Sequence, residues 1–184
     1  MPTEIIILSV LVFTVTAALI GWLIWRRQDP FEREIRKFAR IASDAHLQDI
    51  LLPDGMGGEI HIAHLLRTDK GLLLLDPRSV RGMVFAGEKM QEWSATESGT
   101  RLSFANPIPA LLDRLAAVRA VAQGVPVEGK VVFHNDVTFP KGHPSSVTTI
   151  KQLIDEYTPV NKGQYTLYQN QWLELEELAK LQGN

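Results

Sequence analysis

The chain has 184 residues, a formal net charge of -2 at pH 7 and no cysteine. This length allows one ordinary domain beside a short terminal segment, and a chain without cysteine has neither disulfides nor thiolate metal sites. The near-neutral charge excludes a globally basic nucleic-acid binder, so any such role has to be local.

The segment Ile5 to Trp25 is uncharged and mostly apolar, and it has the length that a bilayer-crossing helix needs. No Lys or Arg precedes it, which argues against a cleaved signal peptide. Only Glu4 lies before the segment, and a basic cluster follows, so the positive-inside rule places the rest of the chain in the cytoplasm. We therefore expect a single-pass protein of a bacterial-type inner (plasma) membrane, with its N-terminus outside. The basic residues are Arg26, Arg27, Arg33, Arg36, Lys37 and Arg40.

Composition divides the chain into four parts. Residues 1–27 are the transmembrane anchor with its basic flank, and residues 28–31 are a linker around Pro30. Residues 32–157 form one domain. Residues 158–184 are a C-terminal extension that contains an amphipathic helix.

The first half of the domain predicts a helix followed by strands. Apolar residues at helical spacing predict a helix over 31–48, and a short strand at 50–52 follows it. Two further strands, 59–67 and 72–75, form a hairpin. Pro77 lacks an N–H group, so we expect the second strand to end, bulge or lie at a sheet edge there.

The second half alternates strands and helices. We expect a strand within 80–85, a hairpin over 93–104, a helix over 108–122, a strand over 129–133, and helices over 150–157 and 171–181. The order predicts an α/β (α+β) fold with a central mixed sheet flanked by helices. The helix over 108–122 is expected to bury a stripe of apolar residues: Leu111, Leu112, Leu115, Val118 and Ala122.

Several short motifs follow one another in a recognisable succession. They resemble the nuclease-related domain (NERD) family, over roughly residues 32–157. The matching segments are Ile60–Leu66, Lys70–Arg78, Arg81–Gly82, Trp93, Phe104–Pro107 and 126–133.

The resemblance implies a restriction-endonuclease-like fold of the PD-(D/E)XK class. In that class, two carboxylates on neighbouring strands hold Mg²⁺, and a lysine activates the water that attacks a phosphodiester. The first metal-binding aspartate of the family falls on Ala63, its glutamate on Asp76, its lysine on Arg78, and a later glutamine on Ala110. Ala63 offers no ligand, and a guanidinium cannot act as a general base. The resemblance therefore implies a degenerate catalytic site at Asp76 and Arg78.

A rearranged site is the alternative. Alternation along a strand puts Glu59 and His61 on the face of Ala63, and Asp76 on the face of Arg78. Glu59, His61 and Asp76 could then act as migrated metal ligands for Mg²⁺, with Glu34 as an outer member.

The other polar and aromatic residues have plain structural explanations. We expect His64 to be a hydrogen-bonded structural histidine and Trp93 to belong to the core. Lys130 is predicted to lie on a solvated strand edge, and His134 and His143 fall in a solvated loop.

Three functions remain open at this point. The first is a pseudoenzyme module that binds nucleic acid, such as DNA, or a protein partner near the membrane. The second is a Mg²⁺-dependent nuclease with a rearranged site. The third is a structural scaffold or oligomerisation module, in which the helix from Trp172 to Leu181 docks a partner or a second copy.

Overall fold

The structure, a computed structural model, describes residues 29–157 and 168–181. The chain divides into two units between Arg33 and Glu34, and both sheets lie in the second unit. The predicted membrane span at 5–25 lies outside the described residues. Within 29–157 and 168–181, no helix is long and apolar enough to cross a bilayer.

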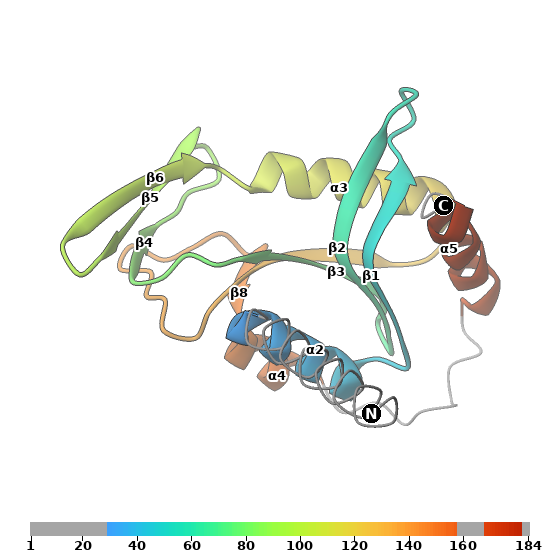
Figure 1. Ribbon diagram of the computed structural model, residues 1–184, viewed down its shortest axis with the longest axis horizontal. Helices are drawn as coiled ribbons and strands as arrows, with labels where there is room; N and C mark the ends of the chain where they lie inside the picture. Colours follow the sequence, from blue (N-terminus) through green and yellow to red (C-terminus); the bar gives the residue numbers. More distant parts are fainter. Residues whose placement is uncertain (1–28, 158–167, 182–184) are drawn as a thin grey trace, which may run out of the picture. The chain divides into compact units, whose positions relative to one another are not determined.

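A mixed five-stranded sheet is the centre of the second unit (Figure 1). Its strands are β1 (Ala45–Pro53), β2 (Glu59–Thr68), β3 (Gly71–Arg78), β7 (Val127–Phe133) and β8 (Val147–Thr149). The strand order is β1-β2-β3-β7-β8; β1, β2 and β3 are antiparallel neighbours, whereas β3, β7 and β8 run parallel. The expected α+β class with a mixed central sheet is confirmed.

Helices cover both faces of this sheet. The helices are α2 (Pro30–Ala42), α3 (Ile108–Val121), α4 (Ile150–Glu156) and α5 (Gln169–Leu181). In Figure 1, α2 and α4 lie side by side on one face and α3 lies on the other. An edge-to-face contact between Phe38 of α2 and Tyr157, which follows α4, joins the first pair, with ring centroids 6.1 Å apart.

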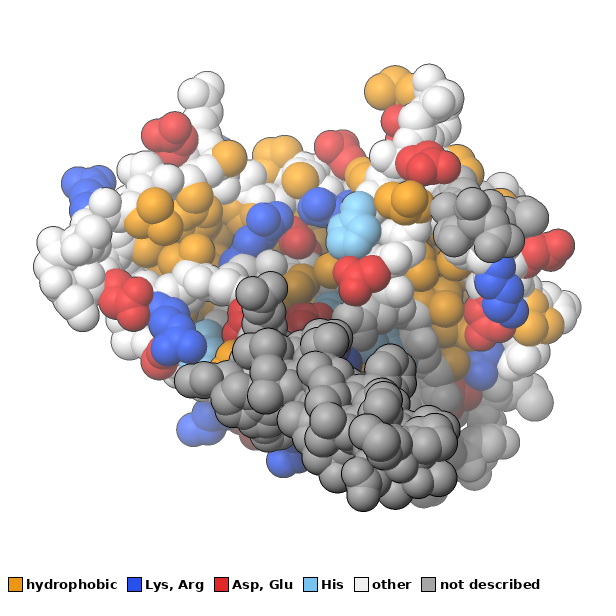
Figure 2. Space-filling view, in the orientation of Figure 1, with side chains coloured by type: hydrophobic (Ala, Val, Ile, Leu, Met, Phe, Trp, Pro, Cys, Tyr) orange, Lys and Arg blue, Asp and Glu red, His pale blue; other side chains and the backbone are white. Residues whose placement is uncertain are grey.

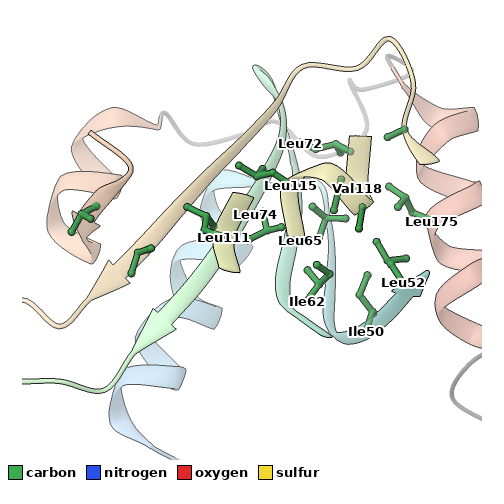
Figure 3. Packing of buried hydrophobic residues seen from close by; sticks show 14 of the residues in the cluster. Ile50, Leu52, Ile62, Leu65, Leu72, Leu74, Leu111, Leu115, Val118 and Leu175 are labelled. Carbon is green, nitrogen blue, oxygen red and sulfur yellow. The ribbon is translucent and has the colours of Figure 1, made fainter. Parts of the chain in front are cut away.

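The face of the sheet toward α3 carries the main hydrophobic core (Figure 3). Leu65 and Leu74 are opposite each other in the β2–β3 register, and both are fully buried. Gly129 of β7 lets α3 approach, because a Cβ there would lie 2.9 Å from Cδ1 of Leu115. Each fully buried leucine contributes about 1.5–3 kcal/mol by leaving water.

The C-terminal helix α5 is part of the same core. Trp172 and Leu175 are 2% and 0% exposed and belong to the core cluster. These two side chains of α5 therefore pack within their own domain.

A second, three-stranded sheet contains β4 (Met83–Phe85), β5 (Glu92–Glu97) and β6 (Thr100–Ala105), in that order. The hairpin expected over 93–104 is confirmed. Trp93 is fully buried, as expected, and donates its indole N–H to the Gly87 carbonyl at 3.0 Å.

The extent of the first helix differs from the prediction, whereas β3 behaves at Pro77 as predicted. The helix expected over 31–48 ends at Ala42, because Asp44 already donates its N–H to the Arg67 carbonyl and starts the β1–β2 pairing. β3 reaches Arg78, but its pairing with β2 stops at Leu75. Among the described strands only β7 borders Pro77, so this residue lies at a local edge, as expected, and its missing N–H breaks no ladder bond.

Two burial predictions are also wrong. Lys130 lies on the interior strand β7 with a side chain only 12% exposed, because Glu128 pairs with its ammonium group at 2.8 Å. Leu112 is 55% exposed, whereas Ala117 is buried in the stripe of α3. Leu111 and Leu115 lie on the side of the helix that faces the sheet, and Leu112 lies outside that side.

Candidate functional site

The positions that correspond to the nuclease motif lie on two neighbouring antiparallel strands. Ala63 is on β2, and Asp76 and Arg78 are on β3. The last registered pair of these strands is His64 with Leu75. Ala63 comes directly before His64 and Asp76 directly after Leu75, so both lie just beyond this pair. The chain thus brings the two expected acid positions close together, but only one of them has a carboxylate.

Asp76 is the centre of a three-residue ionic cluster, which we call the Asp76 cluster (Asp76, Arg78 and Arg114). Asp76 is 6% exposed. Its Oδ2 accepts a hydrogen bond from Arg78 at 2.6 Å and lies 3.4 Å from a guanidinium nitrogen of Arg114. Both contacts place a cation at the same carboxylate oxygen.

Arg114 links three elements at this point. It lies on α3, and its Nε donates to the His61 carbonyl of β2 at 2.8 Å while another nitrogen reaches Asp76 on β3. No sequence pattern distinguishes this role, since Arg114 stands between the buried Leu111 and Leu115 like any polar residue of an amphipathic helix.

The charge of the Asp76 cluster is not balanced. One carboxylate faces two guanidinium groups, which leaves one positive charge in excess. The side chains of Arg78 and Arg114 are 33% and 20% exposed, so both can still reach solvent. Nε of Arg78 is buried and has no hydrogen-bond partner among the described residues. Basic, acidic and histidine side chains meet at the surface between the β1–β2 hairpin and the second sheet (Figure 2).

The proposed migrated ligands are not gathered into one group. His61 pairs with Asp49 through Nε2 and Oδ1 at 3.2 Å, and these side chains are 51% and 64% exposed. Glu59 is exposed at the start of β2, opposite Pro53. Within 29–157 and 168–181, no three His, Asp or Glu side chains are placed to hold a metal ion. In this arrangement the donor set does not fit Mg²⁺, because two guanidinium groups already bind Asp76, the only buried residue of the three expected ligands Glu59, His61 and Asp76.

His64 and the loop histidines are held by local contacts. His64 is fully buried, and its Nδ1 lies 3.0 Å from Nε2 of His46 on the neighbouring strand. Nδ1 of His134 lies 2.8 Å from the carboxylate of Asp136, and Nδ1 of His143 lies 3.0 Å from the Pro144 carbonyl. The contact of His64 agrees with the hydrogen-bonded structural role predicted for it.

Two residues of the matching segments, Asn106 and Gly82, hold the local fold. Asn106 donates through Nδ2 to the carbonyls of Glu88 at 3.1 Å and Met90 at 2.8 Å, and its Oδ1 accepts the N–H of Ile108 at the start of α3. Gly82 has a positive φ of 79°, and a Cβ there would collide with the Thr96 carbonyl. The Asn-Pro motif therefore fixes the loop before β5 and the start of the helix that carries Arg114.

Comparisons with protein-family models, with curated proteins and with solved structures find no match to this chain.

Proposed function

We propose that this chain is a membrane-anchored, cytoplasmic NERD-like module with a degenerate active site, which binds nucleic acid through its phosphates. One observation carries the proposal: the Asp76 carboxylate is bound by two arginines, which together leave a positive charge at the surface. A nuclease site needs a metal ion at this carboxylate, and the side chains present supply cations in its place.

The arrangement of the strands supports the likeness to a PD-(D/E)XK nuclease. The motif positions Ala63 and Asp76 lie on adjacent antiparallel strands, and Asp76 contacts the side chain two residues along its own strand, Arg78. This is the placement of an acid and an acid-x-base motif that the resemblance implies. Ala63 and Arg78 then account for the loss of metal chemistry, since one lacks oxygen and the other does not deprotonate.

Guanidinium chemistry supports phosphate as the ligand. Arginine binds phosphate oxygens through two parallel N–H groups, and its charge persists at every physiological pH. Arg78 and Arg114 come from different elements but meet at one carboxylate, so their exposed nitrogens lie within the reach of one phosphate or of two neighbouring ones. A phosphate contact supplies affinity without base specificity.

The membrane placement rests on the sequence of residues 5–25 and on the basic residues that follow. An anchor would keep the Asp76 cluster near the inner face of the membrane, where the module would bind nucleic acid at the surface of the bilayer.

The test measures binding of the full chain, in detergent, to a short DNA duplex and to an RNA of equal length. Replacing Arg78 and Arg114 together (R78Q/R114Q) changes the net charge of the cluster from +1 to -1. We expect a loss of about tenfold or more in affinity at moderate salt, with a smaller salt dependence of binding. Arg119→Gln is the matched control, since Arg119 lies on α3 but donates to the Val127 carbonyl. Unchanged affinity in the double variant would refute the proposal.

The rearranged nuclease is the second candidate, and it rests on the placement of Asp76 beside the motif position Ala63 on the neighbouring strand. It requires cleavage of DNA or RNA by the full chain with Mg²⁺ or Mn²⁺. It also requires that Asp76→Ala or Glu59→Ala abolishes the cleavage. Metal-dependent cleavage with that sensitivity would replace the binding module by an enzyme.

A further inference from the structure

The outer strand of the second sheet has an open edge. β6 pairs with β5 on one side, and no described strand pairs with its other side (Figure 1). Five of its six residues are exposed, and Phe104 is half-buried. Open edges are usually protected by proline, lysine, bulges or inward charges. β6 has no proline or lysine, and Arg101 is its one charged residue.

The turn that precedes β6 shows which backbone groups face the open edge. Ser98 and Gly99 have φ values of 49° and 83°, as in a two-residue turn of type I′. In such a hairpin the residues that close the turn, Glu97 and Thr100, exchange both backbone hydrogen bonds, and bonded pairs then alternate along the strands. Arg101, Ser103 and Ala105 therefore direct their N–H and C=O groups away from β5, toward the open edge.

The two faces of the edge differ in polarity. Leu102 is 54% exposed and lies opposite Ala95, on the same face as Phe104 and Trp93. Thr100 and Leu102 line a cavity of about 510 Å³ on this side. Arg101 and Ser103 lie on the other face. Figure 2 shows hydrophobic side chains gathered on the visible surface of this sheet.

We infer that a second copy of this chain pairs with β6, antiparallel, across a two-fold axis at Leu102. This register places Leu102 opposite its own counterpart, Thr100 opposite Phe104, and Arg101 opposite Ser103. The outward N–H and C=O groups of Arg101 and Ser103 then satisfy one another, and apolar meets apolar at the axis. A single strand supplies both halves of the contact, as an isologous interface requires.

Neighbouring registers are less favourable. Side-chain alternation allows shifts of two residues only. One such shift places Arg101 opposite its own counterpart, which sets like charges face to face. The opposite shift centres the axis on Ser103 and moves the two copies of Leu102, the one large exposed hydrophobic residue of β6, away from each other. The register centred on Leu102 remains.

The size of the contact sets its strength. Stable dimers bury about 1,200–2,000 Å², and one six-residue edge on each copy supplies less. The pairing is therefore weak in dilute solution and is measured best by covalent trapping. A common membrane, if the anchor of the proposed function is present, would raise the effective concentration of the two copies; the trapping experiment does not depend on it.

The absence of cysteine from the sequence allows a clean test. Leu102→Cys in the full chain, in mild detergent, is oxidised gently, and the rate of disulfide-linked dimer formation is measured. Opposed residues that do not share backbone hydrogen bonds have Cα atoms about 4.5 Å apart, close enough for a disulfide. The control is Leu112→Cys, since Leu112 is 55% exposed on α3. We expect the first variant to cross-link about tenfold faster or more, with the factor falling on dilution; equal rates would overturn the inference.

A mixture of two variants tests the register. Arg101→Cys and Ser103→Cys are exposed positions that lie opposite each other across the axis. After oxidation of an equimolar mixture, the mixed disulfide should exceed either homodimer severalfold. A statistical ratio of products would overturn the register and with it the two-fold pairing. Neither position belongs to the Asp76 cluster, so loss of cross-linking would leave the proposed phosphate binding untouched.

Discussion

Two carboxylate–arginine assemblies in this chain use the same chemistry with opposite results. At one end of β2, Arg67 pairs with Asp44 through two contacts of 2.9 and 2.8 Å, and the side chains are 8% and 7% exposed. Gln169 of α5 accepts a further hydrogen bond from Arg67 at 2.6 Å, and the guanidinium lies 5.4 Å from the Trp172 ring. One positive charge is balanced by one negative charge, and both side chains are almost fully buried.

The Asp76 cluster has the same groups in a different ratio. Two arginines meet one carboxylate, and both arginines are partly exposed. The comparison teaches that an arginine–carboxylate contact by itself says nothing about function. A balanced, enclosed pair fastens α5 to the sheet, whereas an unbalanced, open cluster leaves a positive charge for a ligand.

The largest expected effect lies at the enclosed pair. Asp44→Asn leaves the Arg67 charge buried without its countercharge, so the free energy of unfolding should fall by about 3–5 kcal/mol. Denaturant unfolding of the variant measures this loss. Nucleic-acid affinity per folded molecule should stay unchanged, and a stability loss below about 1 kcal/mol would show that the pair does not hold α5.

A third assembly, of Glu128, Lys130 and Tyr157, is intermediate between these two in burial. Glu128 pairs with Lys130 at 2.8 Å and accepts the Tyr157 hydroxyl at 2.9 Å, but its side chain is 46% exposed. Burial alone would raise the pKa of Glu128, yet the hydrogen bonds from Lys130 and Tyr157 lower its pKa below the usual 4.5.

A lowered carboxyl pKa gives this assembly a pH dependence. Its contribution to stability is present above the unfolded-state pKa and is lost as the pH falls through the folded-state value. Glu128→Gln should cost less than about 1 kcal/mol at pH 7, because solvent screens the group, and the cost should vanish in acid. Unfolding midpoints of the parent chain and of Glu128→Gln, measured from about pH 3 to about pH 7, test this expectation. A cost that grows toward acid would contradict the assignment.

The smallest effect is expected at the exposed pair of His61 and Asp49. His61→Ala should change the free energy of unfolding by less than about 0.5 kcal/mol. Nucleic-acid binding should also change little, since Arg114 contacts only the backbone carbonyl of His61. If His61→Ala instead removed a Mg²⁺-dependent cleavage, the rearranged nuclease would be favoured.

Local patterns in the sequence predicted much of the fold. The hairpin of β5 and β6, the start of α3 at Asn106-Pro107 and the burial of Trp93 all follow from turn chemistry, capping and size. The error at Lys130 arises because β7 lies between β3 and β8, and pairing with a strand far away in the chain is not visible in a local pattern.

The candidate site was predictable only in part. The motif positions pointed to Asp76 and Arg78, and the structure joins them at 2.6 Å. Arg114 was missed because its role depends on how α3 crosses β2 and β3, which no spacing in the sequence encodes. The excess of positive charge follows from that third residue.

The most direct test of a degenerate, phosphate-binding site is the affinity of Asp76→Asn for a short DNA duplex at fixed salt. The substitution removes the one negative charge of the Asp76 cluster and leaves Arg78 and Arg114 in place. The proposed function predicts severalfold tighter binding by the variant, with unfolding measured in parallel to confirm that it is folded. Weaker binding, or a Mg²⁺-dependent cleavage by the parent chain that the variant loses, would contradict it.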